Sequence, residues 1–262
     1  MKEFKISYKS SENVIISAKK IKSNNPNCMI IMAHGINADK EEDGLFTELA
    51  HKLALNNCDS LRFDYRGHGE STGSQQEMTI EGETIDLKKS VEYVKEKSDL
   101  PIILLAASFG AVSTLNYIKN YNDTRISKLI LLNPVLDLNS TFIKPTLPWG
   151  KKNFNKESFD KLDKLGYIHL DKTFKVGYKL LDEMKTIFPY KILEHISIPT
   201  LIIHGNKDTY VSYDISKKYS EINDFCDFVT VDNSEHGFGR SEEGKYVIDT
   251  IINWLNKKEK EI

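Results

Sequence analysis

The chain has 262 residues, of which 40% are hydrophobic and 28% are charged, as in ordinary globular domains. This length suffices for one large domain with a continuous core and room for an insertion. The formal net charge of −2 gives no general attraction to nucleic acid or to an anionic membrane, and no apolar run approaches the ~20 residues that span a bilayer.

The N-terminus and the cysteines bear on compartment and metal binding. Residues 1–7 alternate polar and apolar side chains and lack the apolar core of a secretory signal, so a cytoplasmic protein is expected. The three cysteines, Cys28, Cys58 and Cys226, are odd in number and far apart, with no C-x-x-C pair or Cys/His cluster. We therefore expect buried free thiols in a reducing compartment, no metal and no cofactor.

Strand and helix patterns alternate along most of the chain. Two alternating segments, 4–8 and 14–19, predict an antiparallel hairpin. Short apolar runs predict further buried strands at 28–33, 60–64, 101–105, 128–133, 200–204 and 225–231. Apolar residues at helical spacing predict helices at 45–53, 80–94, 109–120 and 245–257. This alternation indicates an α/β fold with a largely parallel sheet covered on both faces.

One interval breaks that rhythm. Residues 138–198 show no clean repeat of strand and helix but carry many aromatic side chains. A connection of this length inside a compact domain is expected to have a purpose. We interpret it as a cap inserted into a core domain made of residues 1–137 and 199–262. The alternative is a surface subdomain that packs its own aromatic residues.

The most informative motif surrounds Ser108. An apolar strand pattern leads directly into Ala106-Ala107-Ser108-Phe109-Gly110, and a helical pattern follows at once. This layout is typical of a nucleophile elbow, a tight turn that exposes a serine hydroxyl between a strand and a helix. The turn leaves little room two residues before and after the serine, where Ala106 and Gly110 stand. A lone serine in such a run can also be a simple turn residue.

A serine hydroxyl needs a base and an acid that orients the base. Asp208 follows the predicted strand 200–204, and His236 lies between the last strand and the last helix. Catalytic groups of such sheets gather beyond the carboxyl ends of the strands. Ser108, Asp208 and His236, in this chain order, are therefore the predicted catalytic triad. Asp137, which follows the strand 128–133, is the competing acid.

The oxyanion formed by serine attack requires two backbone N–H donors. The residue after the nucleophile supplies one of them, the N–H of Phe109. The loop after the strand 28–33 supplies the other, the N–H of Ile36, where Gly35 lets the backbone turn inward. His34 is interpreted as a residue that orders this loop and not as the base.

Together these residues make the chain resemble an α/β-hydrolase of the serine esterase and lipase group over nearly its whole length. Residues 64–71 are similar to the D-x-R-G-x-G-x-S turn of that family, which implies structural roles for Asp64, Arg66 and His68. The run from Arg62 to Ser71, residues 77–79 and the size of the cap most resemble bacterial cinnamoyl (feruloyl) esterases. The resemblance implies a mostly parallel eight-stranded sheet with helices on both faces and an inserted cap.

Two residues depart from the family pattern. Ala106 replaces the usual first glycine of the elbow, and Phe109 stands where those esterases often carry glutamine. The predicted function is hydrolysis of carboxylic esters with an apolar or aromatic acyl group, with a small-molecule ester as partner. Thioesterase, monoacylglycerol lipase and small peptidase use the same triad and stay open, as do a homodimer and a catalytically silent binding protein.

Overall fold

The computed structural model describes residues 2–11, 13–171, 173–239 and 241–257. The strands are β1 (Glu3–Ser11), β2 (Val14–Ile21), β3 (Cys28–Ala33), β4 (Cys58–Phe63), β5 (Ile102–Ala107), β6 (Ile126–Leu132), β7 (Tyr167–Leu170), β8 (Phe174–Gly177), β9 (Thr200–Gly205) and β10 (Cys226–Val231). The helices are α1 (Leu45–Leu55), α2 (Ile80–Lys95), α3 (Gly110–Tyr121), α4 (Pro148–Asn153), α5 (Lys156–Leu165), α6 (Tyr178–Glu183), α7 (Pro189–Leu193), α8 (Tyr213–Ile222) and α9 (Ser241–Leu255). Short turns are the 3-10 helices η1 (Glu42–Gly44) and η2 (Gln75–Glu77) and the π-helix η3 (Asn139–Ile143).

Within the described residues, eight strands form one sheet in the order β1-β2-β4-β3-β5-β6-β9-β10. The hairpin β1–β2 lies at one edge, and β2 runs antiparallel to β4, while the remaining neighbours are parallel. Every residue of β3, β4, β5 and β9 is buried, as expected for strands covered on both faces. The predicted eight-stranded, mostly parallel sheet is therefore confirmed.

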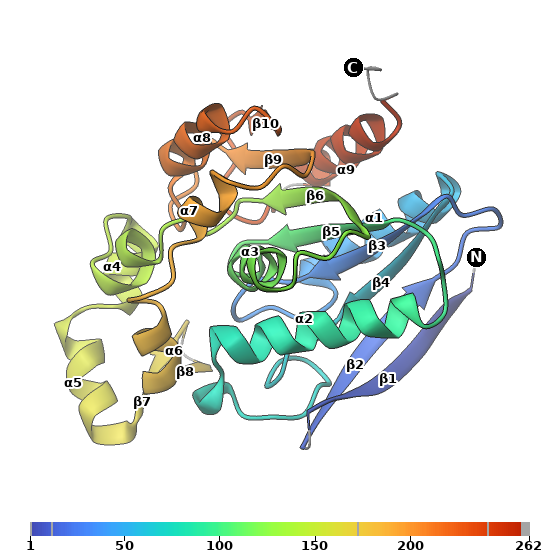
Figure 1. Cartoon of the computed structure of the whole chain (residues 1–262). Helices are drawn as coiled ribbons and strands as arrows, with labels where there is room; N and C mark the ends of the chain where they lie inside the picture. The colour runs from blue at the N-terminus through green and yellow to red at the C-terminus, as the bar shows by residue number, and fades with distance from the viewer. Residues whose placement is uncertain (1, 12, 172, 240, 258–262) are drawn as a thin grey trace.

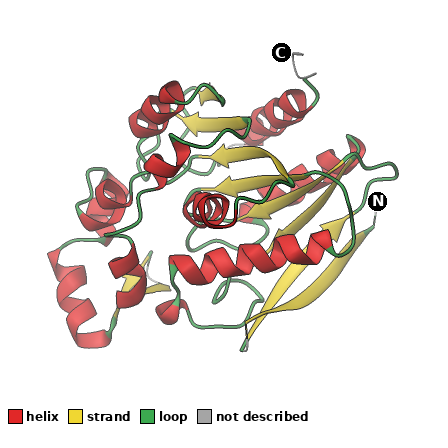
Figure 2. Ribbon diagram, viewed as in Figure 1, coloured by secondary structure: helices red, strands yellow, loops and turns green. Residues whose placement is uncertain are grey.

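Helices cover both faces of this sheet (Figure 1, Figure 2). One apolar cluster joins the sheet to α2, α3, α7 and α8, and a second joins its other face to α1 and α9. The buried face of α1 includes Phe46, Leu49 and Leu53, which are the residues whose spacing predicted that helix. Burying one such side chain contributes roughly 1.5–3 kcal/mol.

Helix α8 was not predicted. Its fully buried residues are Ser216 and Ser220, and its apolar residues Ile215 and Tyr219 are only partly buried. The apolar periodicity on which a helix prediction depends is therefore weak here. The helix begins at a local signal instead, because the Ser212 side chain accepts a hydrogen bond from the N–H of Ile215.

The chain between β6 and β9 forms a group of short elements beyond the carboxyl ends of the parallel strands. Figure 1 shows these strands pointing toward the side on which α4, α5 and α6 lie. The aromatic residues Phe142, Trp149 and Phe154 pack in one apolar cluster with Phe109, which adjoins Ser108. These aromatic side chains therefore contact the elbow as well as one another, whereas α7 packs on the core helix α3. The division into a core and a cap of residues 138–198 stays a prediction.

The expectation of free thiols is wrong for two of the three cysteines. Cys28 and Cys58 form a disulfide, with their Cα atoms 5.0 Å apart. They are separated by 30 residues in sequence, but the parallel register of β3 and β4 places them directly opposite each other. Cys226 is free, and burial raises the pKa of its thiol to about 11. Across the described part of the chain, no helix combines the length and the apolar character that crossing a bilayer requires.

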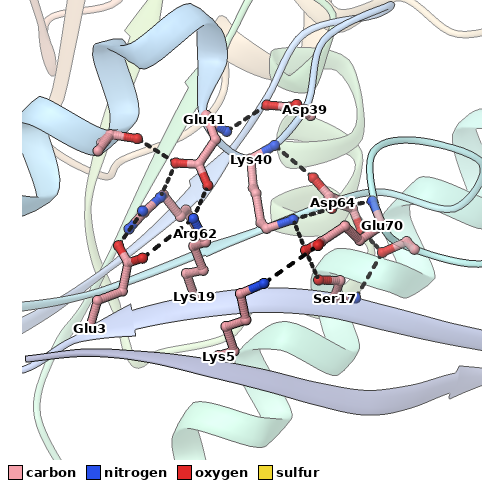
Figure 3. A network of polar contacts seen from close by, with 12 residues as sticks. Glu3, Lys5, Ser17, Lys19, Asp39, Lys40, Glu41, Arg62, Asp64 and Glu70 are labelled. Atoms are coloured by element: carbon pink, nitrogen blue, oxygen red, sulfur yellow. Dashed lines mark hydrogen bonds and ion pairs between the residues drawn. The ribbon is translucent and has the colours of Figure 1, made fainter.

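Asp64 joins the loop after β3 to the turn after β4 (Figure 3). Its carboxylate accepts hydrogen bonds from the backbone N–H and the ammonium group of Lys40, at 2.7 and 2.6 Å, and from the N–H of Glu70 at 2.8 Å. The side chains of Asp64 and Lys40 are 0% and 5% exposed. Lys40 lies in the loop after β3, and Glu70 lies in the turn after β4. This contact supports the structural role expected for Asp64.

Replacing Asp64 by alanine is expected to lower the free energy of unfolding by about 3–5 kcal/mol, because it leaves the buried Lys40 ammonium without its main partner. Urea denaturation measures this effect. Glu70→Ala is the matched control, since Glu70 bonds the same ammonium group at 2.9 Å but its side chain is 57% exposed. Its effect is expected to be much smaller. Equal losses for the two variants would contradict a buried ion pair centred on Asp64.

Candidate active site

Ser108 occupies the turn between β5 and α3. Its φ of +50° lies in the left-handed region, which a residue with a side chain rarely adopts. The turn is held by the Ser108 N–H, which donates to the Leu132 carbonyl, and by the Ser108 carbonyl, which accepts from the N–H of Val135. Such local strain is characteristic of a nucleophile elbow.

Gly110 lets the elbow lie against the loop after β3. A Cβ atom at this position would stand 2.5 Å from the carbonyl oxygen of His34 and 2.7 Å from that of Ala33. No side chain fits there without moving the backbone. Glycine two residues after Ser108 is thus required by the close approach of two loops, which the motif alone could not show.

The three residues predicted as a triad come together in the structure. His236 Nε2 lies 3.0 Å from Ser108 Oγ, and His236 Nδ1 lies 2.7 Å from Asp208 Oδ2. Asp208 follows β9, and His236 lies between β10 and α9, so the side chains converge at the carboxyl edge of the sheet. Asp137, the competing acid, instead accepts hydrogen bonds from the N–H groups of Asn139 and Ser140 at the start of η3.

The Asp208 carboxylate is buried and accepts four hydrogen bonds. Oδ1 accepts from the N–H groups of Tyr210 and Val211, at 2.8 and 2.9 Å, while Oδ2 faces His236 and His204. Burial by itself would raise the pKa of Asp208, but the positive charge of His236 and the hydrogen bonds from both histidines lower it. Asp208 is therefore ionised at neutral pH, and both histidines donate to it.

His204 is a contact of the acid that the sequence did not reveal. Its Nε2 lies 3.1 Å from Asp208 Oδ2, and its Nδ1 is buried without a hydrogen-bond partner among the described residues. This arrangement fits a ring whose Nε2 carries a proton and donates it to Asp208. The sequence placed His204 at the end of the predicted strand 200–204. No sequence pattern distinguishes a buried strand histidine that contacts the acid from one that does not.

The loop after β3 approaches Ser108 closely. A Cβ at Gly35 would lie 3.0 Å from Ser108 Cβ, a tight contact that glycine avoids. The N–H groups of Ile36 and Phe109 donate to no other residue in the described part of the chain. Two uncommitted donors therefore flank the elbow where the sequence predicted the oxyanion hole.

His34 orders this loop, as expected. Its Nδ1 donates to the Gly35 carbonyl at 2.8 Å, and its Nε2 accepts from the N–H of Tyr65 at 3.0 Å. Burial lowers the pKa of His34 to about 4, so the ring is neutral at physiological pH. It has no contact with Ser108 that would make it an alternative base.

Glu42 is a second residue that sequence reasoning missed. Its Oε2 accepts a hydrogen bond of 2.9 Å from the N–H of Gly35, and its side chain lines the cavity beside Ser108 and His236. Burial raises the pKa of Glu42 to about 7, although the Gly35 hydrogen bond and the His236 charge act in the opposite direction. In the sequence it was one acidic residue among several in a polar loop.

The raised pKa of Glu42 predicts a pH-dependent difference in stability. The usual value is near 4.5 and the folded value about 7, so ionisation of Glu42 destabilises the folded protein as the pH rises between these values. Glu42→Gln keeps an acceptor for the Gly35 N–H but does not ionise. Relative to the original protein, this variant is expected to gain on the order of 2 kcal/mol between pH 4.5 and 7.5, measured by urea denaturation.

The neighbouring Glu41 is the control with the opposite sign. Burial would raise its pKa, but hydrogen bonds from Lys19 and Thr47 and the charge of Arg62 lower it to about 2. Glu41→Gln should therefore destabilise the protein at neutral pH, and the difference should shrink as the pH falls below about 4.5. A Glu42→Gln difference that is flat with pH would contradict the assignment.

A cavity of about 210 Å³ opens onto the triad. Ser108 and His236 line it, together with the aromatic side chains of Phe142, Trp149 and Tyr210. Phe109 does not line this cavity, because its ring is 1% exposed and packs edge-on against Phe142. The Phe109 side chain therefore forms no part of the wall of this cavity. Among the described residues, no group of His, Cys, Asp and Glu side chains is arranged to hold a metal ion.

Comparison with known proteins identifies the family and the fold of the chain. Residues 24–157 match the hydrolase family described as serine aminopeptidase, S33. The chain belongs to this family. Solved structures with the same fold include Est1E from Butyrivibrio proteoclasticus with ferulic acid bound, at a TM-score of 0.80 and 21% identity over 95% of this chain and 97% of the other. Another is α/β-hydrolase domain-containing protein 10 from mouse, with a TM-score of 0.72 and 19% identity over 97% and 98%.

Curated relatives include lysophosphatidylserine lipase ABHD12 from Rattus norvegicus, which is 26% identical over 203 residues, or 76% of this chain and 46% of the relative. The protein of that name from Macaca fascicularis is 25% identical over 197 residues, or 74% and 45%. The chain thus spans about half the length of the curated relatives that it matches. The predictions of the α/β-hydrolase fold and of membership in a serine hydrolase family are confirmed.

Proposed function

We propose that the protein hydrolyses carboxylic esters with an apolar or aromatic acyl group through an acyl-enzyme on Ser108. The observation that carries this proposal is the continuous hydrogen-bonded line from Ser108 Oγ through His236 to Asp208. The Ser108 end of this line lies next to the uncommitted N–H groups of Ile36 and Phe109. Nucleophile, base, orienting acid and oxyanion donors are the complete set that acyl transfer requires.

The proposed reaction has two halves. Ser108 Oγ attacks the ester carbonyl while His236 Nε2 takes its proton, and the N–H groups of Ile36 and Phe109 stabilise the oxyanion. His236 then gives this proton to the leaving alcohol, and the Ser108 ester remains. A water molecule, deprotonated by His236, attacks that ester, and the proton returns to Ser108 as the acid leaves. Asp208 holds the imidazole in the required tautomer and stabilises its cation throughout.

The cavity supports the choice of acyl group. Its volume of about 210 Å³ is small for a ligand site, and the rings of Phe142, Trp149 and Tyr210 give it an aromatic wall. A short aliphatic or single aromatic acyl group matches both properties. The bound ferulic acid of Est1E makes hydroxycinnamate esters the first substrates to test, and the ABHD12 similarity adds lysophospholipids.

A substrate panel with a covalent probe tests the proposal. A fluorophosphonate is expected to label Ser108, located by mass spectrometry of the tryptic peptide. Methyl ferulate and p-nitrophenyl butyrate are expected to be cleaved with higher kcat/KM than a monoacylglycerol, lysophosphatidylserine, an acyl thioester or an amino-acid anilide. Preference for one of the latter would replace the substrate class, and a protein that neither reacts with the probe nor cleaves any ester would refute the function.

A further inference from the structure

Three aromatic rings stack in a row from the segment above the site to the histidine of the triad. The rings of His236 and Tyr210 have centroids 4.9 Å apart and are inclined by 9°. The other neighbour of Tyr210 is Trp149 of α4, again at 4.9 Å and inclined by 15°. Tyr210 thus lies between His236, the candidate base, and Trp149, which belongs to the segment between β6 and β9.

Hydrogen bonds fix both ends of this row. Trp149 Nε1 donates to Asp171 Oδ2 at 3.1 Å, and the backbone N–H of Trp149 donates to the Thr209 carbonyl at 3.2 Å. The N–H and hydroxyl of Thr209 donate in turn to the carboxylate of Glu235, the residue before His236. Tyr210 is therefore held by its own backbone neighbours as well as by Trp149.

The Asp208 hydrogen bond alone does not fix the His236 ring. It anchors Nδ1, but the ring plane can still tilt about that contact, and a tilt would move Nε2 away from Ser108 Oγ. A flat ring packed face to face against the imidazole opposes this tilt. The π face of a tyrosine also attracts a cation, and the imidazole becomes a cation when it takes the serine proton.

We infer that Tyr210 is a positioning residue of the base: its ring, backed by Trp149, holds the His236 imidazole in line with Ser108 and stabilises the imidazolium. This inference rests on the proposed role of His236 as the base. It also links the segment between β6 and β9 to the base, because Trp149 lines the cavity and stacks on Tyr210.

Several ionisable groups surround His236 and stay unchanged when Tyr210 is replaced. Asp208 bonds its Nδ1, Glu42 faces it from the loop after β3, His204 reaches it through Asp208, and Glu235 precedes it. Burial raises the pKa of Tyr210, so its hydroxyl is neutral throughout the assay range. A change in the pH profile on replacing Tyr210 therefore reports on the ring.

The test compares Tyr210→Phe with Tyr210→Leu in kcat and KM for p-nitrophenyl butyrate from pH 5 to 9. Phenylalanine keeps the ring and is expected to stay within about twofold of the original protein. Leucine is expected to lower kcat on the order of tenfold with a smaller change in KM. It should also move the acidic limb of the kcat/KM profile to lower pH by about half a unit, because the imidazolium loses its aromatic partner.

Tyr178→Leu is the matched control. Tyr178 is 44% exposed, bonds Asp163 and lies outside the cavity, so neither the rate nor the limb should change. The inference would be overturned if Tyr210→Leu and Tyr210→Phe had equal kcat and the same acidic limb of the kcat/KM profile, with circular dichroism showing that both variants are folded. Failure of the underlying function is recognised separately, because the original protein would then cleave no ester, or Ser108→Ala would keep the esterase activity, whatever stands at position 210.

Discussion

Alanine at position 108 is expected to lower kcat for p-nitrophenyl butyrate by about 10⁶-fold, the loss typical when the nucleophile of such a triad is removed. The reason is that Ser108 Oγ is the atom 3.0 Å from His236 Nε2, and no other nucleophile is described at that position. The variant should still bind the substrate, because the cavity walls and the N–H groups of Ile36 and Phe109 are unchanged. The measurement is kcat with a burst-phase assay, together with loss of fluorophosphonate labelling.

Ser234→Ala serves as the control for a buried serine near the same edge of the sheet. Its hydroxyl makes one weak contact with the Glu235 carbonyl and none with the triad, so its activity should stay close to that of the original protein. If Ser108→Ala remained active at a comparable rate while folded, the acyl-enzyme at Ser108 would be ruled out.

Asn at position 208 is expected to lower kcat by about 10⁴-fold with little change in overall structure. The amide oxygen can keep the hydrogen bonds from the N–H groups of Tyr210 and Val211, which turns the NH₂ group toward His236. His236 Nδ1 must then accept instead of donate. The ring proton moves to Nε2, where it faces Ser108 Oγ, and no base remains.

Asp137→Asn is the matched change at the competing acid. The Asp137 side chain accepts hydrogen bonds from the backbone at the start of η3, and an amide oxygen can replace it there. Its kcat should be nearly unchanged. A large loss for Asp137→Asn together with a small one for Asp208→Asn would reverse the assignment of the acid. The two variants also differ in pH behaviour, since rising pH does not restore a base whose proton is on the wrong nitrogen.

The sequence by itself determined the features that local patterns encode. Apolar runs such as β3 and β9 predict buried strands because strands covered on both faces need apolar residues throughout. Ser108 was recognisable because a tight turn with φ of +50° tolerates only small neighbours such as Ala106 and Gly110. Asp208 and His236 could be proposed because parallel strands deliver the loops at their carboxyl ends to one edge.

Only the tertiary structure decided which distant groups meet. Cys28 and Cys58 pair through the register of two strands, and His204 reaches Asp208 only once β9 is in place. Glu42 and Tyr210 carry no motif, and their roles arise from packing against Gly35 and His236. The physical reason is that a sequence pattern reports the periodicity of one element, while burial, ion pairing and ring stacking depend on what neighbouring elements place opposite it.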